Sequence, residues 1–227
     1  ARYPEQAFVD DNVAGTLNLL EAATAAGCDR FVFTSTTSLM ISEALHRGDL
    51  DRAAWLTEDF GPLQPRNIYG VTKRAAEQLC ARHHREHGLP IVVLRTGRFF
   101  PEEDDTHREL SGPNTKANEF LGRRLTVEDA AEGHVAALDQ APEVGFGLYI
   151  VAASTPFSPD DAEALIEDAP AVIARYFPAG GQVYAGARWG LRTGLLSTSR
   201  SLRRSRAATG SPERASTTSS GSPTRST

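Results

Sequence analysis

Tyr69 and Lys73 are the two residues whose types and spacing point most directly to chemistry. Four positions apart on a helix, they lie on one face, about one turn from each other. An ammonium beside a phenol favours the phenolate and lowers the tyrosine pKa from its ordinary value of about 10, so the pair could exchange a proton with a bound molecule near neutral pH. A surface Tyr–Lys pair without a chemical role is the alternative.

A group of hydroxyl side chains ends an apolar segment. Residues 30–35 are rich in aromatic and β-branched residues, and Ser35, Thr36 and Thr37 stand at the end of this run. A run that is apolar on both faces is typical of a buried strand in a parallel sheet.

The elements that would position these residues alternate along the chain. Apolar periodicity predicts helices over residues 5–27, 67–87 and 127–138. Buried strands are predicted over residues 30–35, 90–95 and 147–152. Gly27 and Gly88 should end the first two helices, whereas Thr126 should cap the third and Ser158 a further helix. This alternation predicts βαβ units and an α/β fold with a parallel sheet.

Two longer segments between these elements are predicted to be loops. Residues 42–66 are polar and contain two prolines, which leaves room for one short helix. Residues 96–122 are rich in Gly, Pro, Asp and Asn, which favours a long functional loop.

Charge and composition divide the chain in two. The net charge is −5, yet residues 191–227 hold seven Arg and one acidic residue, which leaves residues 1–190 strongly acidic. The same tail contains 17 Ser and Thr without hydrophobic periodicity, so we expect it to be disordered. Its basic residues are scattered, which argues against a nucleic-acid or membrane patch, and neither partner is expected.

The cysteines, the apolar runs and the first residues of the chain indicate where the protein is located. Cys28 and Cys80 are far apart and form no CxxC pair, as is usual in a reducing cytoplasm. No apolar run approaches the roughly 18–20 residues that span a bilayer, and the first residues are not expected to form a signal peptide. A cytoplasmic location is therefore expected.

Other polar groups favour structural interpretations. His83, His84 and His87 could offer a pair of ligands to zinc, but HExxH is absent, so an exposed helix end is favoured and no metal is expected. The acidic residues 102–105 are expected to form a solvated loop, and His134 to be a structural histidine.

Four segments in sequence order resemble the extended short-chain dehydrogenases/reductases, specifically the NAD-dependent epimerase/dehydratase family of sugar-nucleotide enzymes. They are residues 12–23 (the helix before the catalytic strand), 31–38 (that strand), 69–73 (the YxxxK signature) and 124–130 (the start of a late helix). The resemblance covers residues 4–189.

The resemblance implies catalytic roles for three residues. Tyr69 would be the general acid/base, and Lys73 would lower the Tyr69 pKa and hold the nicotinamide ribose. Thr36 would hydrogen-bond the reacting oxygen, a role that the neighbouring Ser35 or Thr37 could share.

The resemblance also implies binding roles. The residues beside NAD or NADP would be Asn12, Ser35, Tyr69, Lys73 and Gly97. Thr37 and Arg98 would lie near a small-molecule substrate, expected to be a nucleotide sugar. The family often has Asn at position 98, so Arg98 could clamp a diphosphate or be a solvated loop residue.

The glycines depart from the family pattern. None of the 19 glycines forms the GxxGxxG turn that receives a pyrophosphate at a helix N-terminus. We therefore expect residues 1–190 to form a Rossmann-type doubly wound sheet without its N-terminal GxxGxxG portion, with a small C-terminal substrate region. Such a chain would bind NAD poorly by itself. The composition changes abruptly after Gly190, where the chain becomes rich in Ser, Thr and Arg. A change of reading frame near Gly190 is a hypothesis that would explain this change.

The function expected from the resemblance is that of an NAD(P)-dependent oxidoreductase or isomerase similar to nucleotide-sugar epimerases and dehydratases. A catalytically inactive truncated remnant or binding module, and a reductase of ketosteroids or flavonoid-type ketones, are the alternatives. The resemblance also implies a homodimer formed through the helices at 5–27 and 67–87.

Overall fold

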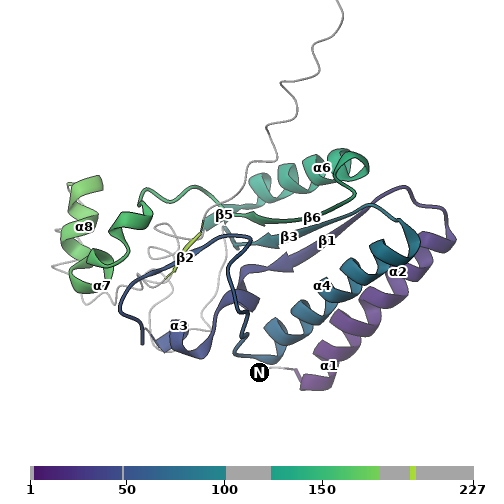
Figure 1. Ribbon diagram of the computed structural model, residues 1–227, viewed down its shortest axis with the longest axis horizontal. Coiled ribbons are helices and arrows are strands. Elements are labelled where there is room, and N and C mark those ends of the chain that lie inside the picture. Colours follow the sequence, from purple (N-terminus) through teal and green to yellow (C-terminus); the bar gives the residue numbers. More distant parts are fainter. Residues whose placement is uncertain (1–2, 48, 101–123, 179–194, 198–227) are drawn as a thin grey trace, which may run out of the picture.

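The computed structural model describes residues 3–47, 49–100, 124–178 and 195–197. A parallel sheet lies between two layers of helices (Figure 1). Helices α2 (Gly15–Ala25) and α4 (Ile68–His87) cover one face, and α6 (Val127–Val144) covers the other. The predicted α/β architecture is confirmed. None of the described helices is long and apolar enough to cross a membrane.

The sheet has three strands in the order β1-β3-β6, namely β1 (Phe31–Thr36), β3 (Ile91–Thr96) and β6 (Phe146–Val151). Each begins and ends within one residue of its predicted range. Thr36 is in register with Thr96, and Thr96 with Val151, so the three carboxyl ends meet at one edge. All six residues of β3 are buried, which explains why its first four residues are apolar without alternation.

The predicted helix over residues 5–27 is interrupted. It consists of α1 (Glu5–Val9), a π-helical turn η1 (Asp10–Ala14) and α2, and it ends before Gly27, whose φ is +70°. Hydrophobic periodicity does not distinguish a π turn from an α turn, so this turn could not be predicted from the sequence. π turns inside helices are frequent at functional sites.

Helix α4 matches its prediction. Asn67 caps the N-terminus, where its side-chain oxygen accepts a hydrogen bond from Gly70 N at 2.9 Å. Gly88 ends the helix in the left-handed conformation at φ +71°.

Helix α6 is longer than predicted. Thr126 Oγ1 accepts a hydrogen bond from Asp129 N at 3.0 Å, as a cap should, but the helix continues past Leu138 to Val144. Ala141 is buried against β3, and this packing extends the helix through Pro142. Because Pro142 has no N–H, the Leu138 carbonyl lacks its helical donor, and Arg30 Nη1 donates to it at 3.3 Å instead.

A second, smaller core lies beside the sheet. It joins α7 (Ala164–Glu167), α8 (Ala169–Tyr176) and the 3-10 turn η3 (Pro159–Asp161), which begins after the predicted cap Ser158. Its largest buried side chains are those of Phe157, Leu165 and Ile173.

The two predicted loops contain short regular elements. The segment 42–66 holds the expected short helix, α3 (Glu43–Arg47), and also a strand, β2 (Ala54–Leu56). After β3 comes β4 (Arg98–Phe100), which pairs with β5 (Arg124–Thr126), while residues 101–123 lie outside the described residues.

The tail contributes one described element. Strand β7 (Leu195–Ser197) pairs in parallel with β2, although residues 191–227 were expected to be disordered. The remainder of this tail lies outside the described residues, so its disorder stays a prediction.

Candidate active site

Three hydroxyl residues at the carboxyl end of β1 are buried, namely Ser35, Thr36 and the following Thr37. Thr36 Oγ1 accepts a hydrogen bond from Ser38 N at 3.1 Å and thereby caps the turn η2 (Thr37–Met40). Thr37 Oγ1 donates to the carbonyl of Thr96 at 3.3 Å, and Ser35 Oγ donates to Glu77 Oε1 at 2.6 Å. These contacts connect the end of β1 with β3 and α4.

Helix α4 brings Tyr69 and Lys73 to this end of the sheet. Gly70 permits a close approach, since a Cβ at this position would lie 3.3 Å from Leu39 Cα in η2. The first turns of α4 therefore pack directly on the turn that follows the hydroxyl residues.

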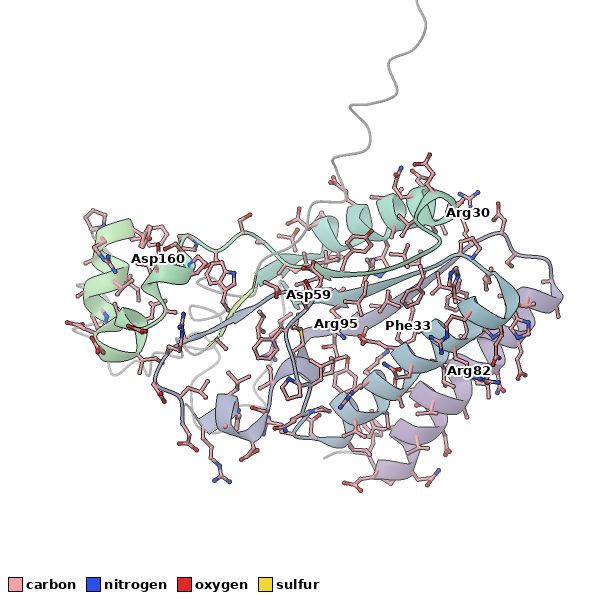
Figure 2. All side chains as sticks on the ribbon, in the orientation of Figure 1. Arg30, Phe33, Asp59, Arg82, Arg95 and Asp160 are labelled. Carbon is pink, nitrogen blue, oxygen red and sulfur yellow. The ribbon has the colours of Figure 1, made fainter. Side chains whose placement is uncertain are left out.

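Lys73 lies against strand β1. Its Nζ donates a hydrogen bond to the backbone carbonyl of Thr34 at 3.0 Å and lies 4.8 Å from the centre of the Phe33 ring, which projects from the sheet toward α4 (Figure 2). Burial lowers the pKa of Lys73 below its ordinary value, against the raising influence of Cys80 and Glu77. An ammonium has three donors, so those not used on Thr34 can serve a bound molecule.

Tyr69 is half-buried one turn before Lys73. Its ring meets Phe8 of α1 edge to face, with centroids 6.2 Å apart. Within the part of the chain that the structure describes, its hydroxyl makes no hydrogen bond, and Lys73 donates to Thr34 rather than to this hydroxyl. The structure thus places the predicted pair on one helix face without a direct bond between them.

Asn12 lies in the π turn η1, beside the same part of α4. Its Nδ2 donates to Thr72 Oγ1 at 3.0 Å, and this hydroxyl can donate in turn to the carbonyl of Ile68 or of Tyr69. The predicted cofactor residue is therefore tied to the turn that carries Tyr69.

Gly97 and Arg98 follow β3 at the same edge of the sheet. Gly97 is buried and its N–H donates to the carbonyl of Val151 at 2.8 Å, while the half-buried Arg98 opens β4. In open parallel sheets this edge is where ligands bind. The structure brings all the predicted site residues to this edge or to the helix turns packed beside it.

Sequence reasoning missed a buried ion pair beneath the site. Arg95 of β3 donates to Glu77 of α4 through Nε at 2.9 Å and through Nη2 at 2.7 Å, and both side chains are at most 5% exposed. A sequence signal existed, because an arginine inside an apolar strand requires a buried partner.

The other polar groups have structural partners. His83 Nε2 lies 2.7 Å from Thr24 Oγ1, His84 Nδ1 lies 2.7 Å from the carbonyl of Leu89, and His134 Nε2 lies 2.7 Å from Thr34 Oγ1. The described residues contain no cluster of three metal-ligating side chains. The acidic residues 102–105 lie outside the described part of the chain.

The fold is shared with solved structures of sugar-nucleotide enzymes. UDP-glucuronic acid 4-epimerase from Bacillus cereus, in complex with NAD, superposes with a TM-score of 0.51 at 21% identity over 85% of this chain and 58% of that one. The sheet and its helices therefore form a Rossmann-type α/β fold, as predicted.

A sequence profile of the NAD dependent epimerase/dehydratase family matches residues 2–152, more than half of the chain, and the chain belongs to this family. It is 39% identical over 101 residues to dTDP-glucose 4,6-dehydratase of Streptomyces griseus, which is 42% of this chain and 28% of that protein. It is 38% identical over 89 residues to UDP-glucose 4-epimerase 4 of Oryza sativa subsp. japonica, which is 39% of this chain and 22% of that protein. The matched region thus spans less than a third of each relative.

Proposed function

We propose that this chain supplies the catalytic residues of an NAD(P)-dependent enzyme that oxidises or isomerises a nucleotide sugar. The observation that carries the proposal is the position of Tyr69 and Lys73 on the first turns of α4, fixed at β1 by the Lys73–Thr34 hydrogen bond. The substrate class is supported by the names of the dehydratase and the epimerase that the sequence resembles.

Tyr69 is the general acid/base of this proposal. As a phenolate it would take a proton from a sugar hydroxyl, and as a phenol it would return that proton to a sugar carbonyl. Thr36 would then hold the reacting oxygen by a hydrogen bond once its hydroxyl rotates toward the ligand. The contact with Phe8 orients the Tyr69 ring.

The ammonium donors that Lys73 does not use on Thr34 support binding of the nicotinamide end of NAD(P). Lys73 would hold the ribose hydroxyls, with Asn12, Ser35 and Gly97 close by. The cofactor, when bound, supplies a hydride acceptor and donor. The sequence contains no GxxGxxG turn, so it offers no equivalent candidate for the pyrophosphate end.

Two further residues would bind the substrate in this proposal. Arg98 would bind the diphosphate of the nucleotide sugar, since a guanidinium donates two parallel hydrogen bonds to such a group. Thr37, at the end of β1, would contact the sugar.

Turnover of nucleotide sugars tests the proposal. UDP- and dTDP-sugars are incubated with the protein and NAD or NADP, and products are separated by chromatography. Tyr69→Phe should reduce turnover by a factor of about 10² to 10⁴, the usual contribution of a general acid/base. Tyr149→Phe, which changes a half-buried tyrosine on β6, is the matched control. Equal rates for Tyr69→Phe and the control would contradict the proposal.

A binding module without turnover is the second candidate function. The absence of a GxxGxxG turn favours it. Calorimetric titration with NAD and with a nucleotide sugar distinguishes the two functions, because the module would bind the sugar nucleotide alone. Ketosteroids and flavonoid-type ketones in the turnover screen test the related reductase activity.

A homodimer is a separate part of the proposal. Leu19 of α2 and Val71 of α4 are 62% and 47% exposed, on the two helices expected at the interface. Light scattering of Leu19→Glu and Val71→Glu should show a smaller mass than that of the unchanged protein. The same mass for all three would contradict this interface.

A further inference from the structure

A buried carboxylate connects the candidate catalytic helix to both central strands. Glu77 Oε1 accepts hydrogen bonds from Ser35 Oγ of β1 at 2.6 Å and from Arg95 Nε of β3 at 2.9 Å. Glu77 Oε2 accepts from Arg95 Nη2 at 2.7 Å. Three elements that are distant in sequence therefore meet at one side chain.

The ion pair between Glu77 and Arg95 is held in place by its burial. The side chains of Glu77 and Arg95 are 4% and 5% exposed, and Arg95 Nη1 is buried without a hydrogen-bond partner among the described residues. A buried guanidinium with one unpartnered nitrogen depends on the carboxylate that neutralises it. Glu77 therefore cannot move away from Arg95 without exposing that charge to an apolar interior.

Two hydrogen bonds join α4 to neighbouring residues of β1. Lys73 binds the carbonyl of Thr34, and Glu77, one helical turn later, accepts from the hydroxyl of Ser35. Neighbouring strand residues thus hold helix residues that share one face. Two such points fix both the rotation of α4 about its axis and its position along β1.

We propose that Glu77 is a positioning residue, which with Ser35 and Arg95 fixes α4 so that Lys73 reaches β1 and Tyr69 faces the ligand edge. The catalytic significance of this arrangement rests on the proposed function. The arrangement itself concerns the protein without ligands, so it can be measured without turnover. Glu77 acts through Lys73 and touches no reacting atom.

The lysine content makes Lys73 directly observable. The sequence contains two lysines, Lys73 and Lys116. Protein labelled with ¹³C and ¹⁵N in lysine therefore gives two side-chain signals by NMR, and Lys73→Arg assigns them. The titratable groups that influence Lys73 are Glu77 and the thiol of Cys80.

Glu77→Gln is the first variant, with Glu86→Gln as the matched control. Glu86 lies on the same helix, exposed to solvent, in an ion pair with Arg82 at 2.9 Å. Glu77→Gln should lower the pKa of Lys73 further, because the carboxylate that favours the ammonium is gone. It should also speed the exchange of the ammonium protons with water. Glu86→Gln should change neither property. A Lys73 signal in Glu77→Gln that titrates and exchanges as in the unchanged protein would overturn the proposal.

Ser35→Ala tests the link to β1 while both buried charges remain, so the proposal can be tested even where Glu77→Gln does not fold. Faster exchange of the Lys73 ammonium protons is expected, since the strand is then held to α4 at one point instead of two. Unchanged exchange in folded Ser35→Ala would show that the Ser35–Glu77 contact does not position Lys73. If neither the unchanged protein nor any variant turns over a nucleotide sugar, the proposed function is wrong. The NMR results still decide whether Glu77 positions Lys73, because they do not depend on turnover.

Discussion

Gly70 and Pro65 lie so close together that a Cβ added at position 70 would be 2.8 Å from the Cβ of Pro65. The same added atom would be 3.3 Å from Leu39 Cα. The glycine next to Tyr69 is thus required by packing, because it lets the start of α4 lie directly against Pro65 and against the turn η2 that follows β1.

Gly70→Ala should therefore destabilise the fold. We expect a loss of about 1–3 kcal/mol in the free energy of unfolding, the usual cost of overpacking against atoms that cannot move aside. Urea denaturation followed by circular dichroism measures it. Gly15→Ala is the control, since its Cβ would meet only Asp10 O at 3.5 Å, and this variant should be neutral or slightly stabilised. Equal stability of the two variants would show that α4 can shift to accept the methyl group.

The buried ion pair predicts strong coupling between its partners. Glu77→Gln or Arg95→Met alone should lower the free energy of unfolding by about 3–5 kcal/mol, because each change leaves the charge of the other side chain uncompensated in the interior. The double variant should cost much less than the sum, since it removes both charges together. A double-mutant cycle from urea denaturation measures the difference. Additive effects would mean that the two side chains do not depend on each other.

The two cysteines should differ in reactivity. Cys28 is exposed and Cys80 is buried, and burial raises the pKa of the Cys80 thiol to about 12. A thiol must ionise to react, so a disulfide reagent at mildly alkaline pH should titrate one thiol in the folded protein and two in denaturant. Cys28→Ser should abolish the reaction of the folded protein. Continued reaction of this variant would show that Cys80 is accessible.

The smaller core should be sensitive to acid through Asp161. Its carboxylate accepts hydrogen bonds from Tyr176 Oη at 2.6 Å and from Ser158 N at 2.8 Å, and these bonds, that of Tyr176 first, hold the pKa of Asp161 below its ordinary value of 3.8. The folded state then binds this proton less readily than the unfolded state. The stabilisation is therefore complete above the unfolded pKa and is lost as the pH falls through the folded pKa.

Stability curves in urea at several acidic pH values measure this effect. Tyr176→Phe removes the largest cause of the lowered pKa, so its stability should change less with pH in the acidic range than that of the unchanged protein. Asp168→Asn is a suitable control, because Asp168 is exposed and caps α8 outside the buried cluster. An unchanged pH dependence in Tyr176→Phe would contradict the assignment to Asp161.

Most of the central fold could be predicted because its signals are local. The apolar runs at β1 and β3, the cap at Thr126 and the stop at Gly88 each depend on a few neighbouring residues. The Tyr69–Lys73 pair was found in the same way, from its spacing on one helix.

The parts that could not be predicted depend on contacts between distant segments. The pairing of β2 with β7 joins residues separated by most of the chain, and neither strand has a strong pattern of its own. Ser35 was predicted from the family resemblance to lie beside a cofactor, and nothing local in the sequence showed that its hydroxyl would meet Glu77. That cofactor contact stays a prediction.

The hydrogen bond from Lys73 to Thr34 also affects how the protein behaves in concentrated solution. Strand β1 is an edge of the described three-stranded sheet, and unpaired edge strands invite pairing with other chains. A strand that added to this edge through the Thr34 carbonyl would have to displace the ammonium and leave a half-buried positive charge without its acceptor. Lys73 would thus also oppose edge-to-edge association of this chain, and its replacement by an apolar residue is expected to lower the solubility of the folded protein.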